Sequence, residues 1–208
     1  MHSKLPRYPA YDKHALRIGR ISMAWNTLHE HFFWMFQEIV GKGDDGKLAY
    51  RIWHSVQNDT AQRAFLKGAI GTTGQPRFVR SVDWLMKQAE KIALERNALI
   101  HAVVRLIGPD DKRVQLYASH TSREAHLMQL ATKSAPDWDR VERNLVVMAN
   151  YASTVWFRHF IEPSLGLQRR PWPKRPRLLG LAGTTKPRAP RRKRKTPTRK
   201  RPPPSSRA

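Results

Sequence analysis

Apolar residues recur at alternating spacings of three and four along most of the first 160 residues, the pattern of helices that bury one face. The pattern predicts helices at about 13–40, 47–57 and 61–70, a fourth beginning near residue 77, and a last one at about 136–161. The first stretch has the heptad spacing of a bundle seam, with apolar positions Ile18, Ile21, Trp25, Leu28, Phe32, Met35 and Ile39. We therefore expect an all-α helical bundle over residues 13–162, after an irregular N-terminus at residues 1–12.

Breaks rich in glycine or proline separate the predicted helices. The segment 41–46 places two acids between glycines, but it lacks the further oxygen ligands of a calcium loop. The segment 71–76 contains glycines and threonines, but no Gly-Lys-Ser/Thr follows, so we reject a phosphate-binding loop. A turn signal at 108–111 and the alternating residues 114–117 predict a small β-hairpin with residues 104–107.

Two polar residues interrupt the apolar face of the fourth predicted helix. Arg96 and Asn97 each stand where the spacing requires an apolar residue. Burial of either group without a partner costs several kcal/mol, so each needs a partner or a cavity. His101 follows Asn97 by four residues and lies on the same helical face, about one turn further along. We expect these three polar groups to converge on one patch.

The segment Arg-Asn-x3-His, preceded by a long amphipathic helix and followed by a short apolar run, resembles the Arg-x4–6-His signature of HEPN domains (higher eukaryotes and prokaryotes nucleotide-binding). The resemblance covers roughly residues 12–162 in pattern and order, and Arg96, Asn97 and His101 match motif positions. It implies an α-helical bundle that, in many members of the family, is a metal-independent ribonuclease active as a dimer. It also implies two copies of the motif at a dimer seam, and products with 2′,3′-cyclic phosphate and 5′-hydroxyl ends.

These residue types suit RNA cleavage without a metal or a cofactor. An imidazole such as that of His101 takes a proton from a ribose 2′-OH near neutral pH. The guanidinium of Arg96 offers a planar set of donors to the charge of a phosphorane-like transition state. The resemblance gives Asn97 the role of orienting Arg96, His101 or the phosphate. The structural alternative is an arginine paired with a bundle carboxylate, an asparagine bonded to the backbone, and a half-exposed histidine.

The character of the chain changes at Pro163. Residues 163–208 contain 10 of the 15 prolines, 16 of the 39 Lys and Arg residues, and no acid. Such a segment buries too little apolar surface to offset its ordering entropy, so we predict a disordered basic tail. Trp172 and residues 178–181 are its only features suited to docking.

A basic tail without acids is expected to bind RNA or DNA without sequence preference, in a salt-sensitive manner. The residues assigned to this binding are Arg169, Arg170, Lys174, Arg175, Arg191, Arg192, Lys193, Arg194, Lys195, Arg199, Lys200 and Arg201.

Composition narrows the remaining options. The absence of cysteine excludes disulfides and thiolate metal sites, and it fits a reducing compartment. No apolar run resembles a signal peptide or approaches a bilayer span, so we expect a cytoplasmic protein without membrane association. His29 and His31 are two apart on a helix and face different sides, so they cannot share a metal ion, and no metal site is expected.

The sequence therefore predicts a HEPN-like homodimer that cleaves RNA without a metal, with the tail adding non-specific nucleic-acid affinity. The competing function is a non-catalytic nucleic-acid-binding protein, in which the bundle dimerises and the tail binds. A third option is one component of a toxin–antitoxin or anti-phage pair, kept inactive by an inhibitory partner protein.

Overall fold

The computed structural model describes residues 9–41, 46–101, 103–107, 113–117, 136–168 and 170–180 of the 208-residue chain. The predictions for residues 1–8, for most of the break at 41–46 and for residues 181–208 lie outside the described residues.

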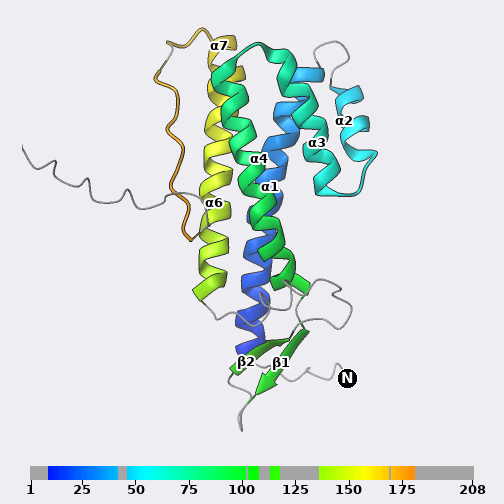
Figure 1. The fold of residues 1–208 in the computed structure, drawn as a ribbon, viewed down its shortest axis with the longest axis vertical. Helices are drawn as coiled ribbons and strands as arrows, with labels where there is room; N and C mark the ends of the chain where they lie inside the picture. The colour runs from blue at the N-terminus through cyan, green and yellow to red at the C-terminus, as the bar shows by residue number, and fades with distance from the viewer. Residues whose placement is uncertain are drawn as a thin grey trace, which may run out of the picture.

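The described part of the chain is all-α apart from one two-stranded hairpin (Figure 1). Each helix predicted from the apolar spacing is present within a few residues of its expected bounds, which confirms the all-α prediction. The elements in chain order are α1 (Pro9–Val40), α2 (Lys47–His54), α3 (Asp59–Ile70), the 3-10 turn η1 (Gly71–Thr73), α4 (Pro76–His101), β1 (Val103–Ile107), β2 (Arg113–Tyr117), α6 (Pro136–Trp156), the π-helical turn η2 (Phe157–Ile161) and α7 (Glu162–Ser164).

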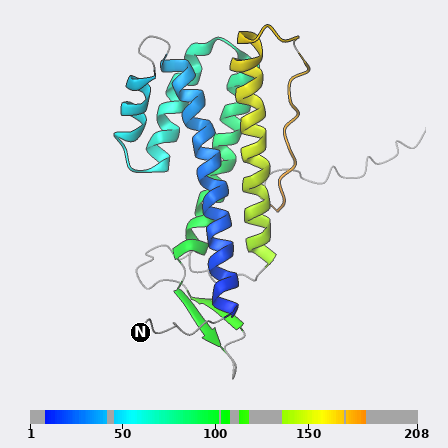
Figure 2. The same cartoon turned by 180° about the vertical axis from the view of Figure 1, so that it is seen from behind.

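Three long helices form the body of the molecule. Helices α1, α4 and α6 lie side by side along its long axis, with α4 running opposite to the other two (Figures 1 and 2). Their apolar faces meet in one core, and burial of this apolar surface is the main force that holds the bundle together. The largest fully buried side chains are Ile21, Trp25, Leu28, Phe32, Met35, Leu66, Phe78, Val82, Leu85, Ile92, Leu145 and Met148.

The short helices α2 and α3 cover the C-terminal half of α1 (Figure 1). Helix α3 packs on both α1 and α4, so its first turns face the middle of the bundle. It begins at a side-chain cap, because Asn58 Oδ1 accepts a hydrogen bond from the Ala61 N–H at 2.7 Å. The position of this cap fixes where the polar first turns of α3 enter the bundle.

The predicted hairpin is present at the end of the bundle where α1 begins and α4 ends (Figure 1). Strands β1 and β2 are antiparallel, and their register pairs Val104 with Leu116 and Leu106 with Val114. The hairpin follows directly on the C-terminus of α4, which carries the motif residues.

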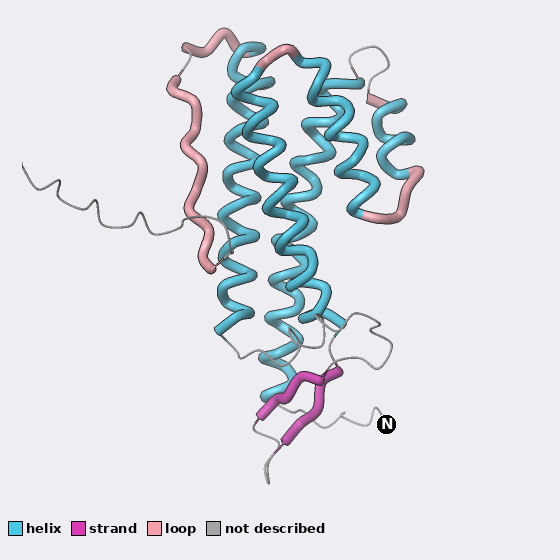
Figure 3. The backbone as a smooth tube through the Cα atoms, viewed as in Figure 1, coloured by secondary structure: helices cyan, strands magenta, loops and turns pink. Residues whose placement is uncertain are grey.

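Residues 170–180, here called the C-terminal arm, return along α6 as an extended segment (Figures 1 and 3). Leu178 is buried, with 3% of its surface exposed. The Asn144 side chain on α6 donates to the Leu179 carbonyl at 2.9 Å and accepts from the Leu179 N–H at 2.8 Å. The prediction of disorder from residue 163 onward is therefore wrong for the described residues up to 180.

The physical reason for this error is the spacing of the docking residues. Trp172 is a single apolar residue between two prolines, and Leu178 begins a short apolar stretch that follows Arg177, so neither gives a helical or strand periodicity. The prolines at 171, 173 and 176 restrict the backbone before folding, which lowers the entropy lost when the arm orders. Both residues belong to the features that the sequence singled out as suited to docking, and that part of the prediction is confirmed.

Candidate functional site on helix α4

The two central motif residues lie close to the C-terminal end of α4 and contact one another. Arg96 Nη1 donates a hydrogen bond to Asn97 Oδ1 at 2.8 Å. His101 is the last residue of α4, one helical turn beyond Asn97, and its side chain lies outside the described part of the chain. The structure therefore brings Arg96 and Asn97 into contact and places the backbone of His101 on the same helix, while the predicted convergence of all three side chains lies outside the described residues.

Arg96 packs its guanidinium over an aromatic ring of α1. The carbon Cζ of Arg96 lies 5.2 Å from the ring centroid of Trp25, which is within cation–π range. Arg96 is half-buried, and burial lowers the pKa of its guanidinium while the charge of Asp59 acts in the opposite direction. Its Nε is buried and has no hydrogen-bond partner among the described residues.

Helix α3 supplies a carboxylate and a second guanidinium to the same cluster. Asp59 Oδ2 accepts a hydrogen bond from Trp25 Nε1 at 2.8 Å. Arg63 lies over the same indole, with its Cζ 5.8 Å from the ring centroid. Arg63 is buried, its Nη2 donates to Thr60 Oγ1 at 3.3 Å, and burial lowers the pKa of its guanidinium against the opposing charges of Asp59 and Glu90.

His29 completes the cluster from α1. Its Nε2 lies 3.3 Å from Arg63 Nη1, and because a guanidinium only donates, Nε2 is the acceptor and Nδ1 carries the proton. Nδ1 lies 4.0 Å from Asp59 Oδ1. Burial is the main cause that lowers the pKa of His29 to about 4, with Arg63 adding to the effect and Asp59 opposing it. His29 is therefore neutral at pH 7.

We call Trp25, His29, Asp59, Arg63, Arg96 and Asn97 the α1/α3/α4 cluster. It contains two guanidiniums, one carboxylate and a neutral imidazole, and the carboxylate of Glu90 adds a further negative charge close to Arg63. Charges with limited access to water interact more strongly than the same charges in bulk solvent.

Sequence reasoning missed Trp25, His29, Asp59 and Arg63 as members of the site. One signal was present for Arg63, because it shares a helical face with two buried residues, Leu66 and Ile70. This is the same interruption of an apolar face that identified Arg96. Asp59 gave no such signal, since an acid at a helix start is ordinarily explained by capping.

The basic residues assigned to nucleic-acid binding fall into two groups. Arg170, Lys174 and Arg175 belong to the C-terminal arm and are exposed on the folded bundle. The side chain of Arg169 lies outside the described residues, as do those of Arg191, Arg192, Lys193, Arg194, Lys195, Arg199, Lys200 and Arg201. The arm residues thus present fixed positive charge beside α6.

Within the described ranges there is no group of His, Asp and Glu side chains placed to hold a metal ion. His29 contacts Arg63, whereas His31 Nδ1 lies 2.7 Å from the Thr27 carbonyl oxygen and its ring packs on Trp34. The two histidines point to different neighbours, as their spacing predicted.

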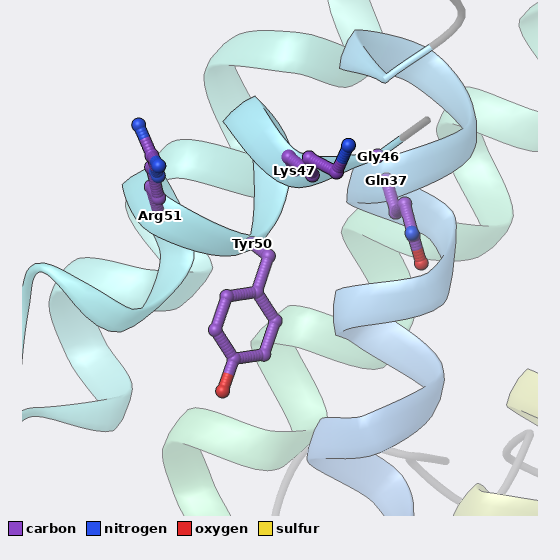
Figure 4. A pocket seen from close by; sticks show the side chains of 5 residues that line it. All are labelled: Gln37, Gly46, Lys47, Tyr50 and Arg51. Carbon is purple, nitrogen blue, oxygen red and sulfur yellow. The ribbon is translucent and has the colours of Figure 1, made fainter. Parts of the chain in front are cut away.

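An open pocket of about 300 Å³ lies between the end of α1 and the start of α2 and is lined by Gln37, Gly46, Lys47, Tyr50 and Arg51 (Figure 4). Gly46 has φ of 75°, a backbone conformation that favours glycine, and a Cβ at this position would have to displace the side-chain amide of Gln37. A second open pocket lies under the C-terminal arm and is more basic, with three arginines in its lining.

No helix in the described part of the chain is both long and apolar enough to cross a membrane. Comparison with known protein families, with curated proteins and with solved structures gives no match for this chain.

Proposed function

We propose that this chain is a metal-independent endoribonuclease of the HEPN type, in which Arg96, Asn97 and His101 form the cleavage site of a homodimer. The basic sequence after Pro163 gives the protein its affinity for nucleic acid. The proposal rests on the sequence motif and on the neighbourhood of Arg96 within the bundle.

The observation that carries the proposal is the partner of the Arg96 guanidinium. Arg96 bonds to the neutral amide of Asn97. Among the described residues no carboxylate forms an ion pair with it, although Asp59 is close enough to favour its charged form. A structural arginine in a bundle is expected to have its charge neutralised by a directly bonded acid. Arg96 instead keeps charge that is available to a phosphate.

The proposed reaction needs one base and one fixed cation. His101 takes the proton of the ribose 2′-OH, the 2′-oxygen attacks the adjacent phosphorus, and the bond to the 5′-oxygen breaks as that oxygen takes a proton from water; the proton on His101 then returns to solvent. Arg96 donates hydrogen bonds to the phosphoryl oxygens as their charge increases. Asn97 holds the Arg96 fork in a fixed orientation, which reduces the entropy lost on forming the transition state.

The test is RNA cleavage by the full chain in EDTA, comparing wild type with Arg96→Lys and with the matched control Arg143→Lys. Lysine keeps the charge and part of the contact with Trp25 but lacks the planar fork. We expect Arg96→Lys to lose about 100-fold or more in rate, with a melting temperature close to that of wild type. Arg143 is exposed on α6, so its replacement should change neither. Equal rates for wild type and Arg96→Lys would contradict the assigned role.

The second candidate function is a nucleic-acid-binding protein without catalysis. The contact of Arg96 with Trp25 favours it, because a guanidinium stacked on a buried ring also stabilises a bundle. This candidate predicts that wild type binds RNA and leaves it intact in EDTA, and that Arg96→Ala is less stable.

A further inference from the structure

The second pocket lies where the C-terminal arm crosses the first turns of α4. Its volume is about 190 Å³, and three arginines line it: Arg77 and Arg80 from α4 and Arg175 from the arm. Ser81, Tyr151 and Trp172 line it as well. The pocket exists only because the arm is folded, since α4 and α6 alone lack the wall that the arm supplies.

Hydrogen bonds hold this wall in place. Trp172 Nε1 donates to Ser81 Oγ at 2.9 Å, and the Tyr151 hydroxyl donates to the same oxygen at 3.2 Å. Arg175 Nη2 donates to the Arg80 carbonyl at 2.8 Å, which fixes one end of its guanidinium and leaves its other N–H groups for a ligand. Ser81 and Tyr151 are buried, so the polar contacts beneath the arm are shielded from water.

The pocket is positively charged, and no carboxylate in its lining balances the three arginines. None of the residues that line it is acidic. Arg77 and Arg80 are three apart, so their side chains leave α4 on the same face. Asp83 on the same helix forms an ion pair with Lys87 at 2.8 Å, and Glu162 is paired with Arg158 at 2.9 Å. Asp83 and Glu162 are thus already paired with other cations.

Three guanidiniums around a small cavity suit a tetrahedral oxyanion. Guanidinium forks donate pairs of N–H groups to phosphate oxygens, and arginine is favoured wherever phosphate is recognised in this way. The cavity exceeds the space of a phosphate and a few waters, because each water occupies about 30 Å³. The half-buried indole of Trp172 at its edge offers apolar surface to the sugar or base that a phosphodiester carries.

We propose that this pocket binds a backbone phosphate of single-stranded RNA, so that the folded arm anchors the nucleic acid. This inference rests on the nucleic-acid-binding part of the proposed function and is independent of cleavage. Arg80 and Arg96 are separated by 16 residues of one helix, or about 24 Å along its axis, and their side chains leave α4 on nearly opposite faces. The pocket therefore anchors the strand away from the cleavage motif.

The experiment compares full-length wild type, the double variant Arg77→Ala/Arg80→Ala, and the control Lys67→Ala/Arg143→Ala. Both double variants lose two positive charges, and the control residues are exposed on α3 and α6, outside the pocket. Binding of a single-stranded oligouridylate is measured at several salt concentrations, with inorganic phosphate and uridine as separate competitors. Melting temperatures are recorded for all three proteins.

We expect Arg77→Ala/Arg80→Ala to bind the oligonucleotide about tenfold more weakly than the control variant. Its slope of log affinity against log salt should be smaller by about 0.7 for each phosphate that the variant no longer neutralises. Equal affinity and slope for the two double variants would overturn the proposal. The assignment to RNA would be overturned by two results together: wild type binds inorganic phosphate as tightly as the oligonucleotide, and the pocket variant keeps its affinity for RNA.

Cleavage in EDTA at saturating RNA separates this inference from the proposed function. Under these conditions the pocket variant should cut at the wild-type rate, because Arg96, Asn97 and His101 are unchanged in it. If wild type fails to cut, the ribonuclease proposal fails while the binding comparison still decides the pocket.

Discussion

At the scale of single residues, the α1/α3/α4 cluster is defined by how each buried polar group is satisfied. Trp25 is central, because its indole N–H bonds to Asp59 while its ring lies beneath Arg63 and Arg96. Burial lowers the pKa of His29 to about 4, so the pH dependence of stability provides a measure of its place in the cluster.

Acidification should destabilise the fold through His29. Its pKa is about 4 in the folded chain and about 6.5 when unfolded, so between these values the unfolded state binds more protons. Stability should be fully retained above pH 6.5, fall as pH drops, and reach its full loss of up to about 3 kcal/mol below pH 4. Denaturant unfolding at pH 7 and pH 5 measures this difference.

The matched variants for this measurement are His29→Gln and His54→Gln. Glutamine keeps an acceptor for Arg63 but does not titrate, so His29→Gln should show a weaker loss between pH 7 and pH 5. His14 is also buried with a lowered pKa, so some acid sensitivity remains in both variants. His54 is exposed, and its replacement should leave the wild-type pH dependence unchanged.

Arg96 and Asn97 could be identified from the sequence because each interrupts the regular spacing of apolar residues along one helix. It did not identify His29, whose partner Arg63 is 34 residues away and on another helix. Pairings of this kind depend on how helices pack, and a single sequence contains no local signal for them.

At the scale of elements, the apolar spacing predicted the helices and hairpin because their stability depends on periodic burial. The C-terminal arm is stabilised by isolated contacts instead of a periodic apolar face. These contacts are the burial of Leu178, the hydrogen bond of Trp172 and the hydrogen bonds of Asn144 with Leu179. Its folding therefore depends on complementary positions on α4 and α6 that its own sequence does not reveal.

Two truncations separate the arm from the sequence that follows it. Deletion of residues 181–208 should leave the melting temperature unchanged, because a sequence so rich in proline, lysine and arginine offers little apolar surface to bury. Deletion of residues 170–208 should lower stability by several kcal/mol, since it uncovers the sites of Trp172 and Leu178 and leaves Asn144 without its partners. Thermal unfolding followed by circular dichroism measures both.

A point variant gives the same information with the chain length intact. Asn144→Ala removes both hydrogen bonds to Leu179 and should cost about 1–3 kcal/mol. The control is Asn150→Ala, because Asn150 is exposed on the same helix. A stability equal to wild type for Asn144→Ala would mean that the arm contributes little to the fold.

At the scale of the whole molecule, the positive charge is concentrated at one end of the sequence. The described arm brings part of this charge back along α6, and residues 181–208 carry a further 11 Lys and Arg residues. The bundle itself carries exposed apolar residues on α1, namely Leu16 at 56% and Met23 at 71% of their surface. Such a surface is expected on a chain that forms dimers through its first helix.

The dimer prediction is tested by sedimentation at tens of micromolar protein. We expect wild type to sediment as a homodimer, and Met23→Glu to shift the population toward monomer because it places a charge in an apolar seam. The control Arg143→Glu changes charge on a different helix and should remain dimeric. A monomeric wild type would exclude a site composed of two motif copies.

The most direct test of the central claim is cleavage of single-stranded RNA by the full chain in EDTA, comparing wild type, His101→Ala and His54→Ala. We predict that wild type and His54→Ala produce 2′,3′-cyclic phosphate ends at equal rates, and that His101→Ala is slower by about 100-fold or more. RNA affinity and melting temperature should be the same for all three proteins. Wild type that binds RNA and leaves it intact, or His101→Ala that cuts at the wild-type rate, would contradict the account.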